Sequence, residues 1–213
     1  MSTSTSSTTE RRERGPLAGY EVVVCVSGGI AAYKTAALVS KLIQEGCGVT
    51  VAMTRNARRF VGPTTFHALT GRPVLTSLWE REAATERGRD HDVAGGGGAM
   101  KHLEPSAGAD LIIVAPATAN VIGKLANGIA DDLVSTLLLG TDCPVLLAPA
   151  MNTRMWNHPA VQRNIAFLRE HAFALVGPEE GWLACGDVGP GRMSEPDRLV
   201  AAIRQHLLSK PPR

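Results

Sequence analysis

Five apolar segments of strand length are spaced along the chain, and stretches with helical patterning lie between most of them. This alternation predicts a single α/β domain in which a doubly wound parallel sheet carries helices on both faces. Right-handed crossovers would place the successive helices over the sheet. The expected strands are 21–26, 49–53, 111–116, 145–150 and 173–176.

The first helix has the clearest pattern. Apolar residues between Ala31 and Ile43 share one face, the charged residues of the same stretch lie elsewhere, and Gly46 ends the helix. Pro159 and Pro196 suit the first turns of two later helices. These later helices are expected at 130–139, 159–170 and 196–208.

The chain has 213 residues, of which 44% are hydrophobic, and is long enough for one sizeable core. We expect the domain to cover residues 19–208, between a polar tail over 1–18 and a short tail over 209–213. Residues 80–99 combine charge with four consecutive glycines, which predicts a flexible insertion, with a phosphate-binding loop as the alternative. A glycine-rich segment over 181–194 could fold over a site as a substrate lid.

Charge and cysteine usage argue against several classes of function. The formal net charge of +2 suggests no nucleic-acid partner. The four cysteines lie far apart without the spacing of metal ligands, so we expect no metal site and reduced thiols in a cytoplasmic protein. No apolar run approaches the roughly 20 residues that span a bilayer, and the N-terminus has no apolar stretch typical of a signal peptide. We therefore expect no membrane association.

Small residues follow the first strand directly and lead into the first helix. In Ser27-Gly28-Gly29-Ile30, backbone N–H groups at the helix start could bind an anion, and the Ser27 hydroxyl could add a contact. The segment lacks the Lys-Ser/Thr pair of a P-loop and the third glycine of a dinucleotide motif, which favours a mononucleotide such as FMN over ATP or NAD. A tight turn without a ligand is the alternative.

Polar side chains also follow the second and third strands, at the same edge of the sheet. Thr54 and Arg55 could share the phosphate or ribityl chain, although loop polarity explains them almost as well. Thr118, Ala119 and Asn120 combine hydrogen-bonding groups with little bulk and suit a planar ring, with helix capping as the alternative. Such strand ends converge in a flavodoxin-like (Rossmann-like) doubly wound sheet, where the ligand lies at the topological switch point. The convergence favours a flavin site.

Three further segments carry side chains that could do chemistry. After the fourth strand, Asn152 is a directional hydrogen-bonding group among the large apolar residues of Pro149 to Trp156, as a small-molecule pocket requires, with a core-facing loop end as the alternative. His102 precedes the third strand and is a candidate base near neutral pH, but it is one of six histidines and position alone does not select it. Cys185 lies in the lid segment and could present a thiol, with a loop cysteine of no role as the alternative.

Several of these blocks resemble the homo-oligomeric flavin-containing cysteine decarboxylase family. The block after the fourth strand matches the family's Pro-x-Met-Asn-x-x-Met-Trp signature. The block with Cys185 is similar to that of members that act on phosphopantothenoylcysteine in coenzyme A biosynthesis, whereas members that act on peptidyl cysteine lack this cysteine. The resemblance extends from Tyr20 to Met193 and rests on Ser27-Gly28-Gly29, the segment around His102, Ala115 to Asn120, Pro149 to Trp156, and Ala184-Cys185-Gly186 with Gly189-x-Gly191.

The resemblance implies FMN-dependent decarboxylation of 4'-phosphopantothenoylcysteine to 4'-phosphopantetheine, through oxidation next to the thiol, loss of carbon dioxide from the thioaldehyde and reduction of the resulting enethiol. His102 would be the base of the oxidative stage and Cys185 the proton donor of the reductive stage. Asn152 would hold the substrate carboxylate, with Ala184 and Met155 beside the substrate, although Met155 could equally be a packing residue. The flavin would contact Ser27, Gly28, Gly29, Ile30, Thr54, Arg55, Thr118, Ala119, Asn120 and Ala150.

The chain departs from the family pattern at Val121, where threonine is frequent, at Pro105, and in the long 80–99 insertion. The resemblance implies a homo-oligomer, either a trimer or a trimer-based dodecamer. Many bacterial relatives carry a second domain that joins cysteine to phosphopantothenate, so we expect a separate phosphopantothenate–cysteine ligase in the pathway.

Three other functions occur on related folds or with related motifs. A peptidyl-cysteine oxidative decarboxylase would share the flavin, His102 and Asn152, but Cys185 argues against it. A flavin prenyltransferase of the same fold lacks the Met-Asn-x-x-Met-Trp pattern. A non-catalytic regulatory flavoprotein usually has long acidic extensions or lost catalytic residues, and this chain shows neither.

Overall fold

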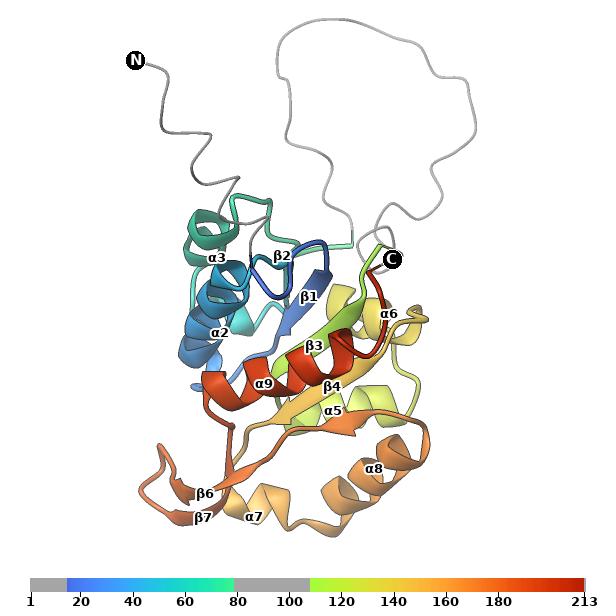
Figure 1. The fold of residues 1–213 in the computed structure, drawn as a ribbon. Helices are drawn as coiled ribbons and strands as arrows, with labels where there is room; N and C mark the ends of the chain where they lie inside the picture. Colours follow the sequence, from blue (N-terminus) through green and yellow to red (C-terminus); the bar gives the residue numbers. More distant parts are fainter. Residues whose placement is uncertain (1–14, 79–107, 213) are drawn as a thin grey trace, which may run out of the picture.

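The computed structural model describes residues 15–78 and 108–212, and its centre is a five-stranded parallel sheet. The strands lie in the order β2-β1-β3-β4-β5 (Figure 1). This order reverses direction between β1 and β3, which makes their carboxyl ends the topological switch point. The predicted doubly wound α/β fold of flavodoxin type is confirmed. The strands are β1 (Glu21–Val26), β2 (Gly48–Met53), β3 (Leu111–Ala117), β4 (Val145–Pro149) and β5 (Ala174–Leu175).

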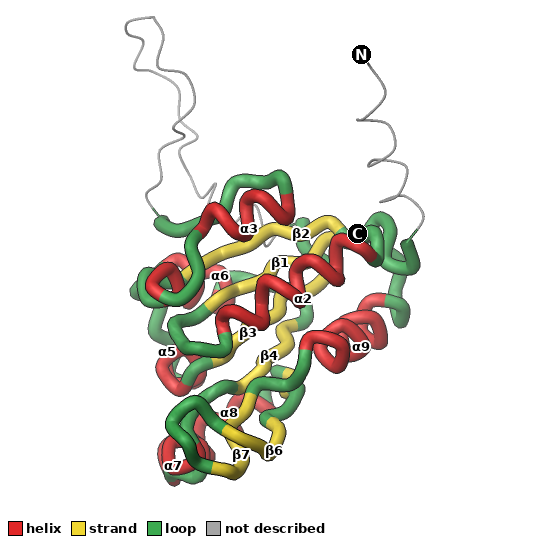
Figure 2. Tube along the Cα trace, turned by 90° about the vertical axis from the view of Figure 1, so that its left-hand side faces the viewer, coloured by secondary structure: helices red, strands yellow, loops and turns green. Residues whose placement is uncertain are grey.

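Helices cover both faces of the sheet and give the molecule three layers (Figure 2). One face carries α2 (Ala32–Gln44), α3 (Pro63–Thr70) and α9 (Pro196–Leu207). The opposite face carries α5 (Ala119–Ala126), α6 (Leu133–Leu139) and α8 (Pro159–Glu170). Two short elements, η1 (Ala57–Arg59) and α7 (Thr153–Trp156), follow β2 and β4.

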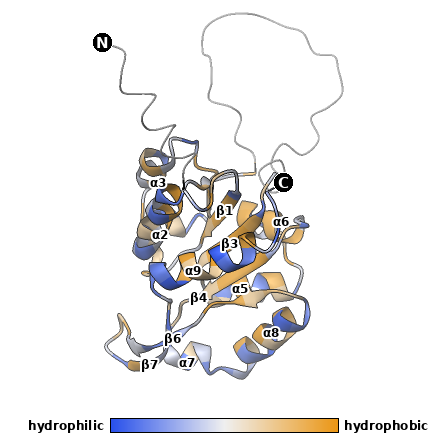
Figure 3. Ribbon diagram, in the orientation of Figure 1, coloured by the Kyte–Doolittle hydropathy of each residue, from blue (hydrophilic) through white to orange (hydrophobic). Residues whose placement is uncertain are grey.

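Alternation along the central strands creates a hydrophobic core on each face. In β1, Val22, Val24 and Val26 pack with α2 and α9, whereas Val23 and Cys25 pack on the side of α5 and α6. Because both faces of such a strand are covered, its sequence is an almost continuous apolar run, as the mostly hydrophobic colouring of β1, β3 and β4 shows (Figure 3). This continuity explains why the strand positions could be predicted.

The helices differ from the sequence expectation in two ways. α3 and α5 were not expected, and α5 begins at Ala119, within the segment predicted to contact a ligand. Its Val121, Ile122 and Leu125 are buried, so this segment both ends a strand and starts a packed helix. The helix expected over 130–139 begins only at Leu133.

The folded part of the chain begins before residue 19. Leu17, which we expected in the polar tail, is fully buried, and its N–H donates to Glu45 O at 2.9 Å. Near the other end, Tyr20 Oη donates to Lys210 O at 2.6 Å. Hydrophobic burial of Leu17 therefore corrects the expected tail boundary. The predicted insertion over 80–99 lies outside the described residues.

A two-stranded antiparallel hairpin lies beyond the carboxyl edge of the main sheet, beside α7 (Figure 1). Its strands are β6 (Glu179–Trp182) and β7 (Val188–Arg192). Met151, just after β4, donates its N–H to Gly191 O at 2.9 Å and so connects the hairpin to the main sheet. This hairpin makes up most of the predicted lid segment over 181–194.

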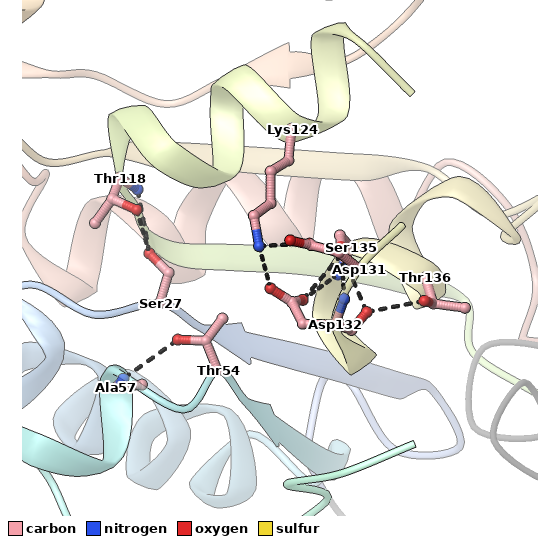
Figure 4. A network of polar contacts seen from close by, with 9 residues as sticks. All are labelled: Ser27, Thr54, Ala57, Thr118, Lys124, Asp131, Asp132, Ser135 and Thr136. Atoms are coloured by element: carbon pink, nitrogen blue, oxygen red, sulfur yellow. Dashed lines mark hydrogen bonds and ion pairs between the residues drawn. The ribbon is translucent and has the colours of Figure 1, made fainter. Parts of the chain in front are cut away.

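Asp132 organises the start of α6 (Figure 4). Its Oδ1 accepts a hydrogen bond from Ser135 N at 2.8 Å, and Ser135 Oγ accepts one from Asp132 N at 3.1 Å, which completes a capping box. Lys124 Nζ on α5 lies 2.6 Å from a carboxylate oxygen of both Asp131 and Asp132. Burial alone would raise the pKa of Asp132, but hydrogen bonds from Lys124 and Ser135 outweigh it and hold this pKa below its usual value.

We expect Asp132→Ala to lower the free energy of unfolding by about 1–2 kcal/mol, because it removes the helix cap. Asp131→Ala is the matched control, since it removes the other partner of Lys124 and leaves the cap in place. The folded-state pKa of Asp132 is depressed, so its contribution is present above about pH 4 and is lost as the pH falls through that pKa. Urea unfolding at neutral and acid pH measures both effects, and equal losses in the two variants would contradict the capping role.

Candidate active site

A cavity of about 840 Å³ lies at the carboxyl ends of β1, β3 and β4 and is bordered by the β6-β7 hairpin. A cavity of this size at the switch point of a doubly wound sheet suits a small molecule or a cofactor. The structure therefore brings together most of the predicted site residues that it describes. Those that line the cavity are Gly28, Gly29, Ile30, Thr118, Ala119, Asn120, Ala150, Asn152, Met155, Ala184 and Cys185.

The loop after β1 passes very close to the loop after β2 at Gly28. A Cβ at this position would lie 2.5 Å from Asn56 Cβ and 2.9 Å from the Asn56 carbonyl carbon, so the approach requires glycine. No side chain in the described part of the protein caps the following helix, whose backbone bonding starts with Ala32 N–H donating to Gly29 O at 3.0 Å. The N–H groups that precede Ala32 are the ones that an anion would use at this end of the helix dipole.

The Ser27 hydroxyl, which we expected to contact a ligand, does not line the cavity. It is buried and donates to Pro116 O at 2.7 Å. It also accepts a hydrogen bond from Thr118 N at 3.2 Å (Figure 4). These bonds connect the ends of β1 and β3. Ser27 therefore fixes the two strand ends between which the cavity opens.

Thr54 and Arg55 also lie outside the cavity wall. Thr54 is buried and its Oγ1 accepts a hydrogen bond from Ala57 N at 3.2 Å (Figure 4). Arg55 borders a separate depression together with Arg58 and Arg59. Both residues follow β2, which is the edge strand and one strand removed from the switch point. Thr54 and Arg55 do lie at the carboxyl edge of the sheet, as expected. Because β2 is separated from the switch point by β1, they are not part of the cavity wall.

Asn152 is held by the start of α7. Its Oδ1 accepts hydrogen bonds from Arg154 N at 2.8 Å and Met155 N at 3.2 Å, as an N-cap. The amide oxygen is occupied by the cap, whereas the Nδ2 group stays available as a donor. Nδ2 lies 4.0 Å from Cys185 Sγ. Met155 lines the same cavity, whereas Trp156 packs against the core and is not part of the wall.

Cys185 is the exposed one of the four cysteines, all of which lie in the described part of the chain. It occupies the turn of the β6-β7 hairpin, and its thiol lies 3.4 Å from Asp187 Oδ2. Burial raises the pKa of Cys25 and of Cys47 to about 12, which disfavours the reactive thiolate form of both. Cys185 is therefore the thiol that is available for reaction, and it lies beside Asn152.

Sequence reasoning missed several residues of the wall. Lys34, Arg192 and Glu195 place two cations and one carboxylate in the cavity. The hydrogen bond from Lys34, followed by that from Arg192, holds the pKa of Glu195 below its usual value. Lys34 follows the small-residue loop by one helical turn, which is a usable signal, but nothing local in the sequence connects it with Glu195. The other missed residues of the wall are Ala31, Tyr33, Met151, Trp182, Leu183, Gly191 and Met193.

Gly191 joins the hairpin to the segment that carries Asn152. Its φ is +135°, and an added Cβ would lie 2.2 Å from Met151 O. We expect Gly191→Ala to lower Tm by several degrees, since a side chain in this backbone region costs about 1–3 kcal/mol before the clash is counted. Gly123→Ala in α5 is the control, because its nearest neighbour would lie at 3.7 Å and alanine favours a helix. Equal Tm values for Gly191→Ala and the unchanged protein would contradict this prediction.

The predicted base, His102, lies outside the described residues. Within 15–78 and 108–212, no group of three or more His, Cys, Asp or Glu side chains is arranged to hold a metal ion. None of the helices in this part of the chain has the length and apolar character needed to cross a bilayer.

Among curated proteins, the chain is 49% identical over 186 residues to the coenzyme A biosynthesis bifunctional protein CoaBC of Bacillus subtilis (strain 168). This match covers 87% of the chain and 43% of the relative, so the chain spans less than half the length of that protein.

Two solved structures share the fold over nearly their whole length. The FMN-dependent cysteine decarboxylase SpaF is 34% identical, with a TM-score of 0.72 over 91% of this chain and 98% of that one. A PPC decarboxylase mutant, in which serine replaces a cysteine and pantothenoylaminoethenethiol is bound, is 28% identical, with a TM-score of 0.71 over 87% of this chain and 97% of that one. The model of the Flavoprotein family matches residues 10–208. With this match over most of its length, the chain belongs to the Flavoprotein family.

Proposed function

We propose that the chain is an FMN-dependent phosphopantothenoylcysteine decarboxylase, which converts 4'-phosphopantothenoylcysteine to 4'-phosphopantetheine in coenzyme A biosynthesis. The observation that carries the proposal is the pairing of an amide donor, Asn152 Nδ2, with a thiol, Cys185 Sγ, 4.0 Å apart in one cavity. The relatives named above include a coenzyme A biosynthesis protein and a PPC decarboxylase, and both agree with this substrate.

The described residues fit FMN. The backbone at Gly28 lies so close to Asn56 that a larger residue would not fit there. The helix that follows has no side-chain cap, so its first backbone N–H groups can bind a phosphate monoester. The small residues Thr118 and Ala119 line the same cavity and leave room for a planar ring. Bound FMN would supply the capacity to accept a hydride from the substrate and to return it. The side-chain contacts of Ser27, Thr54 and Arg55 with the flavin stay predictions.

The geometry gives Asn152 and Cys185 separate tasks. Asn152 keeps its amide N–H donors while its oxygen is used as a cap, so it can bind the substrate carboxylate but cannot accept from it. Cys185 is exposed, and its thiol can donate a proton to the enethiol carbon. Met155 and Ala184 would contact the substrate in the same cavity. We assign the base of the oxidative stage to His102 on the family resemblance alone.

Mass spectrometry of 4'-phosphopantothenoylcysteine after incubation with the flavin-loaded protein tests the proposal. We expect loss of carbon dioxide and formation of 4'-phosphopantetheine. Unchanged substrate in the presence of bound flavin would overturn it and favour a peptidyl-cysteine substrate or a regulatory flavoprotein. A peptide ending in cysteine is the parallel substrate that separates these two alternatives.

We further infer that the protein forms a homo-oligomer, either a trimer or a trimer-based dodecamer. Large apolar side chains around the cavity are strongly exposed in the single chain, among them Ile30 at 58%, Tyr33 at 60% and Trp182 at 69%. Such a group favours a protein partner, here a second copy. Light scattering should give three or twelve times the chain mass of 22.5 kDa, and a monomer at micromolar concentration would contradict the inference. A phosphopantothenate–cysteine ligase is the partner activity that would supply the proposed substrate.

A further inference from the structure

Glu195 joins two cations in the wall of the cavity. Its Oε1 lies 2.8 Å from Lys34 Nζ and also accepts a hydrogen bond from Arg192 Nη2. The three residues come from three places in the fold: the first turn of α2, the end of β7, and the position just before α9. A single carboxylate therefore connects α2, the helix that follows the small-residue loop after β1, with the hairpin that carries Cys185.

Within residues 15–78 and 108–212, the arrangement leaves both cations with unused donors. Lys34 has three N–H donors, and its Nζ contacts Glu195 Oε1 and, at 3.5 Å, Met193 O. Its side chain is only 12% exposed, so the ammonium is held in place and is not free in solvent. Arg192 uses one nitrogen of its guanidinium on Glu195. Because two positive charges share one negative charge, Glu195 stays ionised and the cavity keeps a positive charge.

The position of Arg192 makes this connection important for the hairpin. It directly follows Gly191, whose carbonyl accepts the hydrogen bond from Met151. The base of the hairpin is thus fixed to the main sheet on one side by Gly191 and to α2 on the other side by Arg192 through Glu195. Cys185 lies in the turn at the other end of the same hairpin, so a change of angle at the base displaces the thiol from Asn152.

We propose that Glu195 is a positioning residue, which holds Lys34 and Arg192 together and thereby keeps the Cys185 thiol over the cavity while the proton is delivered. The role of the thiol as proton donor rests on the proposed function. Glu195 would act through Lys34 and Arg192 and would contact neither the thiol nor the reacting atoms. Its removal should leave the oxidative stage largely intact and impair the stage that needs Cys185.

Glu195→Gln tests the proposal in the full, flavin-loaded protein, because it keeps the size of the side chain and removes its charge. The control is Asp197→Asn, which removes a carboxylate two residues away that pairs with Lys41 of the same helix α2 at 2.7 Å, outside the cavity. The first readout needs no substrate. Since Cys25, Cys47 and Cys143 are buried, alkylation by iodoacetamide followed by intact mass reports on Cys185.

We expect Glu195→Gln to change the alkylation rate of Cys185 by about fivefold or more, and Asp197→Asn to leave it unchanged. With 4'-phosphopantothenoylcysteine in air, where dissolved oxygen reoxidises the flavin left reduced when enethiol is released, the ratio of released enethiol to saturated product should rise by a similar factor in Glu195→Gln and stay unchanged in Asp197→Asn. Arg192→Gln breaks the same connection from the hairpin side and must reproduce both changes, which separates the connection from a general loss of folding.

Wild-type alkylation rates and product ratios in both Glu195→Gln and Arg192→Gln would overturn the proposal. Failure of the unchanged protein to decarboxylate its substrate would instead count against the proposed function. The alkylation comparison would still decide whether Glu195 positions the hairpin, because it depends on the thiol and not on turnover.

Discussion

Asn152→Asp is expected to lower kcat/KM for 4'-phosphopantothenoylcysteine by at least about a hundredfold while Tm changes little. Aspartate is as good an N-cap as asparagine, so the bonds from Arg154 N and Met155 N are kept. The change replaces the amide N–H donors with a carboxylate that repels the substrate carboxylate. Steady-state kinetics with thermal unfolding of the same preparation measures the two effects separately.

The two effects can be separated because Asn152 Oδ1 caps α7 whereas Nδ2 would bind the substrate. Asn152→Ser is the matched control, since serine is also an accepted N-cap but introduces no charge, and its loss of activity should be smaller. Flavin absorbance of both variants checks that the cofactor is retained. Activity of Asn152→Asp close to that of the unchanged protein would remove Asn152 from substrate binding and leave it as a helix cap only.

Cys185→Ser is expected to stop the reaction at the enethiol. A serine hydroxyl is a far weaker acid than a thiol, and general acid catalysis contributes about 10²–10⁴-fold, so formation of saturated product should fall by at least about a hundredfold. One carbon dioxide per bound flavin should still be released, since the oxidative stage does not use this thiol, and further turnover requires dissolved oxygen to reoxidise the reduced flavin. Mass spectrometry distinguishes the enethiol from 4'-phosphopantetheine by two hydrogens.

The control for this variant is Asp187→Asn, which changes the carboxylate 3.4 Å from the thiol and leaves the thiol in place. It should still give saturated product. Cys185→Ala should behave as Cys185→Ser does, because neither side chain can donate the proton. A normal yield of 4'-phosphopantetheine from Cys185→Ser would show that another group delivers it.

The core of the fold could be predicted because its determinants are local. The apolar runs of β1, β3 and β4 and the amphipathic face of α2 are visible in short windows of sequence. The hairpin was harder to predict, since Glu179–Trp182 and Val188–Arg192 contain few apolar residues and are held by their position beside α7. Leu17 is likewise buried by core residues distant in the sequence, and its polar neighbours in the chain give no sign of this.

The candidate site shows the same contrast. Gly28, Asn152 and Cys185 follow recognisable strand ends or motifs, and the structure brings them to one cavity. Thr54 was expected there from its place after β2, but the lateral order of the strands cannot be read from the order of the sequence. The contact between Lys34 and Glu195 joins residues 161 positions apart and has no local signature.

The cavity wall draws on segments from Gly28 in the first loop to Glu195 before the last helix. No single supersecondary unit contains enough of it to bind a ligand, so a partly folded chain has no site to offer. A molecule held there would stabilise only the completed fold, by about 2.7 kcal/mol when its free concentration is a hundred times its Kd. Saturation with flavin should therefore oppose global unfolding, and resistance to proteolysis should increase with the logarithm of the flavin concentration.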